Sequence, residues 1–157
     1  MADTGPLVVE FEVRAPLEHA FAMWTDRVAM WWPSTHTVSG SPEAIVFEPR
    51  PGGRIFERAP GGAEHPWGEV LDWEPPTRLR YRWHLFFDPS EATDVEVTFT
   101  PLADSPDGVA VRIAQAGWER LGDAGPPRRS RTYQAWGALI PSYVSATGQG
   151  VRDRDGS

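Results

Sequence analysis

Hydrophobic and polar residues alternate along most of the chain between residues 44 and 116, in short runs separated by turns. In the stretch 94–100, Val95, Val97 and Phe99 fall on one face and polar residues on the other. This period of two is typical of a strand with one buried face. We predict seven strands, at 7–14, 44–48, 54–58, 65–73, 78–86, 94–100 and 109–115. Because the last six follow one another through short turns, they predict an antiparallel meander.

A helical period appears in one long stretch, residues 128–147. The residues that share one helix face there are Tyr133, Trp136, Gly137, Ile140, Tyr143 and Val144. Their spacing predicts a long C-terminal helix, with Arg128 off the buried stripe. Residues 17–30 predict two short helices after the first strand. The expected fold class is therefore α+β, with a curved seven-stranded antiparallel sheet wrapped around the long helix.

The length of 157 residues fits one domain with a real core. We place this domain at residues 1–147 and predict that the polar stretch 148–157 is a disordered tail. The N-terminus shows no basic segment followed by an apolar run, and no stretch approaches the ~20 apolar residues that span a bilayer. We therefore expect a cytoplasmic protein without a membrane span, and the sequence leaves open whether it forms a homodimer.

Composition and motifs exclude several classes of function. A net charge of −7 argues against non-specific nucleic-acid binding, which needs a basic face. Without cysteine the chain has no disulfide, thiol nucleophile or thiolate metal site. The histidines, His19, His36, His65 and His84, form no pair at metal-ligand spacing. Neither a GxSxG motif nor a phosphate-binding glycine loop is present. We therefore assign no catalytic residue, no metal site and no cofactor.

The stretch 67–84 reads as a hairpin for which two registers are open. If residues 74–77 form a symmetric four-residue loop, Glu69 lies opposite Arg82, and the opposite charges suit a solvated outer face. A slip of one residue would instead place Glu69 opposite Trp83 and turn it inward. We prefer the first register because it separates the polar from the apolar residues, which makes Glu69 and Arg82 an exterior ion pair.

The most informative composition figure is the content of eight tryptophans, more than a core of this size requires. We predict that aromatic and aliphatic side chains from separate elements line a ligand pocket: Trp32, Phe47, Phe56, Trp83, Trp118, Tyr133, Trp136 and Ile140. In this hypothesis Trp83 and Tyr133 face each other across the pocket. Glu57 and His84 are its candidate polar groups, and the sequence leaves open which face His84 occupies. The alternative is that these rings simply fill the core.

Several stretches carry a family resemblance. They are VRAPLEHAFAMWTD at 13–26, Trp31-Trp32-Pro33, the turn at 50–54, WGEVLDWEPPTRLRYRWH at 67–84 and GWERLG at 117–122. Together they resemble the SRPBCC superfamily, also called START-like or helix-grip, and within it the branch named for the activator of the heat-shock protein 90 ATPase. The resemblance implies a hydrophobic cavity between a concave sheet and the long helix. It implies no single function, because members bind or transform very different ligands.

Three functions follow as hypotheses. The first is binding of a small apolar or aromatic molecule between the sheet and the C-terminal helix. The second is an enzyme of the cyclase, dehydratase or hydrolase type that acts on such a ligand, so whether the protein is an enzyme stays open. The third, which the branch name implies, is a protein-interaction module that resembles a chaperone ATPase activator.

Overall fold

The computed structural model of the protein describes residues 4–156, and the side chains of this range up to Gly148 except Pro106. Seven strands form one antiparallel sheet: β1 (Leu7–Arg14), β2 (Ala44–Phe47), β3 (Arg54–Arg58), β4 (Glu64–Glu74), β5 (Arg78–Trp83), β6 (Thr93–Leu102) and β7 (Ser105–Ala116). Their order across the sheet is β1-β7-β6-β5-β4-β3-β2. The strands after β1 thus form the predicted meander, and β1 pairs beside β7 at one edge.

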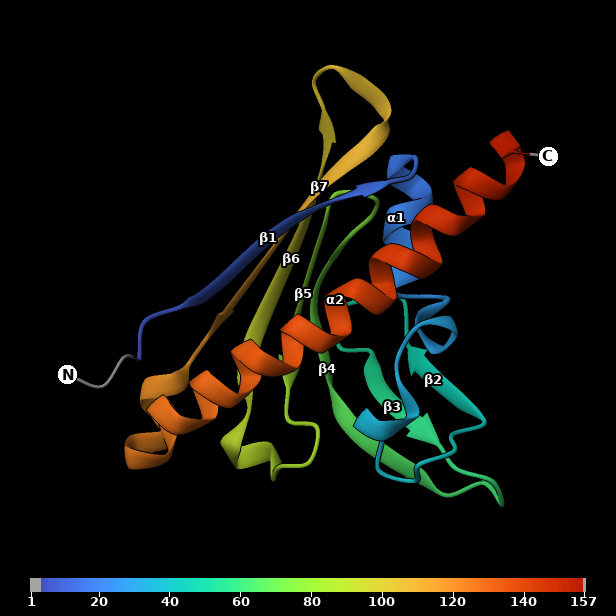
Figure 1. The fold of residues 1–157 in the computed structure, drawn as a ribbon. Coiled ribbons are helices and arrows are strands. Elements are labelled where there is room, and N and C mark those ends of the chain that lie inside the picture. Colours follow the sequence, from blue (N-terminus) through green and yellow to red (C-terminus); the bar gives the residue numbers. More distant parts are fainter. Residues whose placement is uncertain (1–3, 157) are drawn as a thin grey trace.

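The helices lie on one side of this curved sheet. Helix α1 (Leu17–Trp24) follows β1, and the second short helix is a single 3-10 turn at Val28–Met30. Helix α2 (Gly125–Gly156) runs obliquely across the concave side (Figure 1). This arrangement confirms the predicted α+β helix-grip fold. None of the helices in the described range is long and apolar enough to cross a membrane.

The bounds of α2 differ from the sequence prediction at its end. The helix extends to Gly156, through most of the stretch 148–157 that we predicted to be a disordered tail, and Ser157 lies outside the described residues.

The buried face of α2 is rotated relative to the predicted stripe. Up to Gly148, the part of α2 whose side chains are described, the buried residues are Gly125, Arg128, Trp136, Leu139, Tyr143 and Thr147. Tyr133 instead is 58% exposed and Gly137 is also exposed, so the predicted stripe was wrong at both positions. Side-chain polarity predicts the reverse for Tyr133 and Arg128, because the sequence does not display the tertiary contacts that bury the arginine here.

An aromatic cluster joins α1, α2 and the turn after α1. The ring centroid of Trp24 lies 4.9 Å from that of Tyr143 and 5.2 Å from that of Trp31, and it stacks on Trp136 at 5.9 Å. The hydroxyl of Tyr143 donates a hydrogen bond to the carbonyl of Ala20 at 2.7 Å. These contacts hold the middle of α2 against α1.

The hairpin of β4 and β5 has the predicted exterior pair but a different turn. Glu69 pairs with Arg82, and their side chains, 50% and 48% exposed, approach to 3.9 Å. The strands close at Glu74 and Arg78, so the loop is one residue shorter than predicted. A bulge at Leu71 adds the missing residue to β4 and restores the register beyond it.

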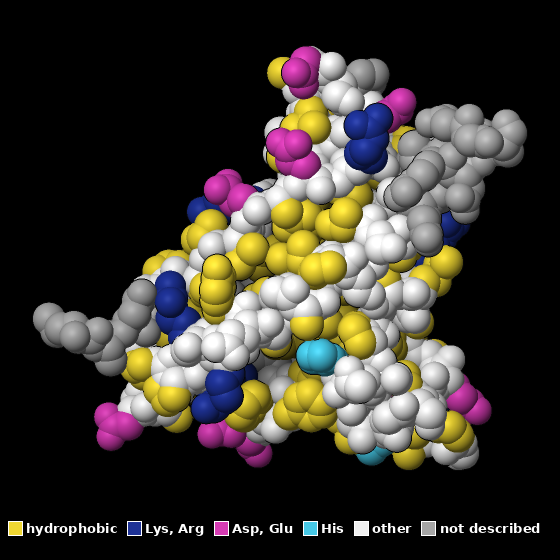
Figure 2. All heavy atoms as spheres, viewed as in Figure 1, with side chains coloured by type: hydrophobic (Ala, Val, Ile, Leu, Met, Phe, Trp, Pro, Cys, Tyr) yellow, Lys and Arg dark blue, Asp and Glu magenta, His cyan; other side chains and the backbone are white. Residues whose placement is uncertain are grey.

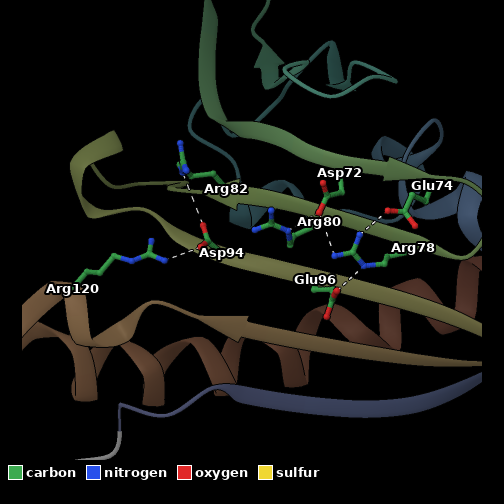
Figure 3. A network of polar contacts seen from close by, with 8 residues as sticks. All are labelled: Asp72, Glu74, Arg78, Arg80, Arg82, Asp94, Glu96 and Arg120. Atoms are coloured by element: carbon green, nitrogen blue, oxygen red, sulfur yellow. Dashed lines mark hydrogen bonds and ion pairs between the residues drawn. The ribbon is translucent and has the colours of Figure 1, made fainter.

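Charged side chains cover the convex face of β4, β5 and β6 (Figure 3). The Arg78 guanidinium lies 2.7 Å from Glu96, 2.8 Å from Glu74 and 3.2 Å from Asp72. Arg80 lies 2.7 Å from the same Asp72 carboxylate. Because successive side chains of a strand point to opposite faces, this outward row leaves Leu79, Tyr81 and Trp83 of β5 facing α2.

Candidate functional site

A cavity of about 220 Å³ lies between the concave side of the sheet and the first half of α2. Its lining residues are Trp32 and His36 before β2, Trp83 of β5, Leu85, Phe86 and Phe87 of the next loop, Gln115 of β7, and Arg128, Arg131, Thr132, Ala135, Trp136 and Leu139 of α2. Figure 2 shows the hollow beneath α2, with hydrophobic side chains inside it and basic side chains at its rim. The cavity therefore opens to the surface beside α2.

Three tryptophans form the aromatic walls of this cavity. Trp32 and Trp83 meet edge to face, with ring centroids 5.7 Å apart. The indole nitrogen of Trp32 donates to the carbonyl of His36 at 2.9 Å, which holds the turn against the ring. Trp136 enters from the opposite side, on α2, and is 3% exposed. The three rings thus come from three separate segments of the chain.

Gln115 is the buried polar group of the cavity wall. Its Oε1 accepts a hydrogen bond from the Trp136 indole at 2.9 Å, and its Nε2 donates to the Thr93 hydroxyl at 2.9 Å. Since an indole N–H can only donate, this contact assigns the amide orientation. A primary amide has two N–H groups and two oxygen lone pairs, so one donor and one acceptor site remain beyond these two bonds. Gln115 can therefore orient a polar atom of a molecule in the cavity.

Basic side chains lie where the cavity opens. Arg128 is only 5% exposed, and its Nη1 donates to the carbonyl of Glu91 at 2.5 Å. Its guanidinium also lies 3.6 Å from the centroid of the Phe87 ring. Burial lowers the pKa of Arg128, and the nearby Glu91 carboxylate partly opposes this effect. Arg131 and His36 add to the basic character of the rim.

The loop after β5 supplies the outer edge of the cavity. Phe86 is 58% exposed and has a φ of 71°, an uncommon conformation for a residue with a side chain. Phe87 is also exposed, and its backbone N–H donates to the carbonyl of His84 at 2.6 Å. Two exposed aromatic rings at an opening are available to cover a molecule that enters it.

The structure brings together only part of the predicted pocket set. Trp32, Trp83 and Trp136 line the cavity. Phe47 packs edge to face on Tyr81, with ring centroids 5.4 Å apart, and is not part of the lining. The remaining aromatic and aliphatic candidates lie elsewhere.

Trp118 is fully buried and donates to the backbone carbonyl of Gln115, behind the cavity wall. Ile140 is half-buried on α2 and does not line the cavity. Phe56 lies under the guanidinium of Arg54, 4.3 Å from its ring centroid, among the charged side chains outside the cavity. Tyr133 lies in a separate groove on the other side of α2. The expected facing pair of Trp83 and Tyr133 is therefore wrong.

The two predicted polar groups also lie outside the cavity. The Glu57 carboxylate is fully buried and accepts from the backbone N–H groups of Val38 and Ser39, the Ser39 hydroxyl and the Trp67 indole. Burial alone would raise the pKa of Glu57, but these hydrogen bonds outweigh it and hold the pKa below its ordinary value. His84 is 7% exposed and lies in another hollow, beside Glu69 and Arg82.

Sequence reasoning missed Gln115, Arg128 and the two phenylalanines of the loop. A signal existed for Gln115, because it continues the inward-facing period of Val109, Val111 and Ile113 in β7. Arg128 lies two helical turns before Trp136, a spacing that places both on one face. No group of three or more acidic or histidine side chains suited to a metal ion occurs in the described part of the chain.

Comparison with known proteins was consistent with this architecture. The sequence profile of the family described as "Activator of Hsp90 ATPase homolog 1-like protein" matches residues 14–141. Among curated proteins, none matches the chain. The anthrahydroquino-gamma-pyrone synthase Txn09, solved as a complex, is 32% identical, with 77% of this chain and 82% of that chain covered and a TM-score of 0.57.

Two further solved structures share the fold. Protein MLL2253 from Mesorhizobium loti is 26% identical over 95% of this chain and 97% of its own, with a TM-score of 0.62. The self-sacrificing resistance protein CalC from Micromonospora echinospora is 22% identical over 96% of both chains, with a TM-score of 0.68, and shows the fold alone. The profile match spans most of the domain. The chain therefore belongs to the family of activator of Hsp90 ATPase homolog 1-like proteins, within the SRPBCC superfamily.

Proposed function

We propose that the protein binds a small planar aromatic molecule in the cavity beneath α2. The observation that carries this proposal is the open space of about 220 Å³ between Trp32, Trp83 and Trp136. Aromatic rings favour offset-stacked and edge-to-face contacts with other rings, which three indoles at different angles can supply to a flat molecule. Gln115 offers the oriented polar contact that such sites typically include.

The size of the cavity limits the ligand. An apolar cavity of ~150 Å³ accommodates benzene, and drug-sized ligand sites start at ~300 Å³. A volume of about 220 Å³ therefore suits one or two fused rings. A larger ring system would extend through the opening between Phe87 and Arg131.

The similarity to Txn09 supports an aromatic ligand. That protein is 32% identical to this chain and is named as an anthrahydroquino-gamma-pyrone synthase. A molecule of that kind contains fused aromatic rings and several oxygen atoms. Such chemistry matches a site with aromatic walls and a few polar groups.

Blocking the cavity tests the proposal with a matched pair of variants on α2. Ala135 lines the cavity, whereas Ala138 is exposed one turn later and does not. Ala135→Phe is expected to fill the space and abolish binding of naphthalene derivatives, measured by calorimetry. Ala138→Phe should leave binding unchanged. Equal binding by both variants would place the ligand elsewhere and contradict the proposal.

A second candidate function is an enzyme that acts on the bound molecule, which the synthase name of the 32% identical relative favours. The ionisable groups available to it are those of the cavity, namely Arg128, Arg131 and His36. Incubation with a naphthol-type or polyketide-like compound, followed by mass spectrometry, distinguishes the two functions. Recovery of the compound unchanged would support binding alone.

A further inference from the structure

The cavity is basic in an acidic protein. The chain carries 22 acidic and 15 basic residues, yet no Asp or Glu is among the described residues that line the cavity. The same lining includes Arg128, Arg131 and His36. The two arginine charges at this opening therefore have the sign opposite to the net charge of −7, and they favour the approach of an anion there.

Of the two arginines, Arg128 is the stronger indication of an anionic ligand, because it is buried. A buried cation is costly unless it is paired and hydrogen-bonded. Its contacts are a backbone carbonyl, that of Glu91, and the face of the Phe87 ring. The Glu91 carboxylate is nearby but beyond ion-pair distance, and no other carboxylate pairs with Arg128 in the described part of the chain. The arginines on the convex face differ in this respect. There Arg78, for instance, lies within 3.2 Å of three carboxylates.

The position of Arg128 on α2 also favours contact with a ligand in the cavity. It lies two turns before Trp136 on the buried face of α2, with Arg131 beside it at the opening. A guanidinium has five N–H donors in a planar fork, which suits the two oxygens of a carboxylate. One of these donors is engaged by Glu91, so others remain for a ligand. The tryptophan walls would hold the rings of the same ligand.

We propose that the ligand of this cavity is an aromatic anion, with its rings among Trp32, Trp83 and Trp136 and its anionic oxygen facing Arg128 and Arg131. The oxygen belongs to a carboxylate or to an ionised phenol or enol. This inference rests on the proposed function, since it adds a charge requirement to the same cavity. It predicts that a neutral molecule of the same shape binds more weakly.

Two probes of equal shape separate the charge from the rings. Calorimetry with 2-naphthoate and with its neutral amide, 2-naphthamide, compares them directly. We expect the wild-type protein to bind 2-naphthoate about 10- to 100-fold more tightly, the range for a hydrogen bond to a charged group. Raising the salt from roughly 0.05 to 0.5 M should weaken the binding of 2-naphthoate and leave that of 2-naphthamide unchanged.

Substitutions of the two arginines test whether they cause the preference for 2-naphthoate over 2-naphthamide. Arg131→Gln, at an exposed position, is expected to reduce the preference for 2-naphthoate by about 2- to 5-fold. Arg128→Gln should reduce it by about tenfold or more. Arg112→Gln removes the same charge from the convex side, where Arg112 lies 4.0 Å from Glu10, and serves as the control that should change nothing. If Arg128→Gln does not fold, the salt dependence of the wild-type protein still decides the question.

The outcomes distinguish failure of this inference from failure of the proposed function. Binding of both probes with equal affinity overturns the anion requirement and leaves aromatic binding in place. Absence of binding by either probe overturns both. An equal effect of Arg131→Gln and Arg112→Gln also overturns the inference, because it would reflect net charge alone. A third comparison, between the acidic phenol 2,4-dinitro-1-naphthol and its neutral methyl ether, tests the kind of oxygen: tighter binding of the phenol indicates that the site accepts an ionised phenol or enol, and equal binding restricts the anion to a carboxylate.

Discussion

Buried polar side chains differ in how many of their hydrogen-bonding groups have a partner in the protein, as Glu57, Gln115 and Arg128 show. The Glu57 carboxylate accepts four hydrogen bonds and ties the segment at 38–39 to β4. Gln115 keeps part of its amide free, and Arg128 lacks a carboxylate partner within the described residues. A fully satisfied buried group stabilises the fold, whereas a partly satisfied one at a cavity is available to a ligand.

The stability that Glu57 contributes should depend on pH in a defined direction. Because its folded-state pKa lies below the ordinary value of 4.5, this contribution is present above that value and is lost as the pH falls through the folded-state pKa. Glu57→Gln replaces one acceptor oxygen by an amide that cannot accept. We expect it to lower the free energy of unfolding by ~2–3 kcal/mol at pH 7, and by less below pH ~4.

Urea unfolding of both proteins at the two pH values measures this effect. Glu69→Gln is the control, because Glu69 is half exposed and its pair with Arg82 is long, at 3.9 Å. A deficit of Glu57→Gln that stays constant with pH would show that the ionised carboxylate is not the stabilising species.

The two large aromatic residues of α2 should differ sharply in their contribution to stability. Trp136 is 3% exposed, whereas Tyr133 is 58% exposed. Trp136→Ala is expected to lower the free energy of unfolding by ~3–5 kcal/mol, the cost of deleting a large buried side chain. Tyr133→Ala should change it by less than ~1 kcal/mol. Chemical denaturation measures both, and similar losses would mean that the face of α2 has been misassigned.

At the scale of elements, close backbone approach determines how β4 meets β5. Gly68 lies in β4 opposite Trp83, and a Cβ there would run into the carbonyl oxygen of Arg82. The position therefore accepts only glycine without a shift of the strands. Since Trp83 is a wall of the cavity, this strand contact also positions the site.

Two glycine-to-alanine substitutions test this contact against a position with room. Gly68→Ala is expected to destabilise the protein by ~3 kcal/mol or more, because the clash is with backbone that cannot move alone. Gly137→Ala, in the exposed part of α2 with open space around it, should stabilise it by ~0.5–1 kcal/mol. Thermal and chemical unfolding give both values. A neutral Gly68→Ala would mean that β4 and β5 separate more easily than their register suggests.

At the scale of the whole molecule, the helix and the sheet form two layers that do not close completely at one end. The aromatic cluster of Trp24, Trp31, Trp136 and Tyr143 fills the space around the middle of α2. Near the start of the same helix the layers leave the cavity of about 220 Å³. The aromatic cluster thus holds α2 in place, and the cavity lies beside the earlier part of the same helix.

A ligand that fills this cavity should stabilise the whole fold by linkage. At a concentration 100 times its dissociation constant, we expect a gain of ~2.7 kcal/mol and a rise in Tm of roughly 5–10 °C. Differential scanning calorimetry with and without 2-naphthoate measures the rise. The Ala135→Phe variant should show no rise, and an equal rise in that variant would indicate binding outside the cavity.

Local patterns of hydrophobic and polar residues were enough to predict the strands, the order of elements and the long C-terminal helix. Periods of two and of about three and a half are local properties that each segment displays without its neighbours. The sequence also indicated the outward pair of Glu69 and Arg82, because alternation in the hairpin separates polar from apolar faces. Three of the predicted pocket residues, Trp32, Trp83 and Trp136, line the cavity.

Which buried side chains meet, and which space stays open, depends on contacts between elements that no local pattern displays. Arg128 is polar and was expected outside, but the Phe87 ring and the Glu91 carbonyl accept its guanidinium at the cavity. Tyr133 is aromatic and was expected inside, but the rotation of α2 exposes it. That rotation follows from contacts of α2 with α1 and β1, which lie near the other end of the sequence. A cavity is space that several elements leave together, so no single segment encodes it.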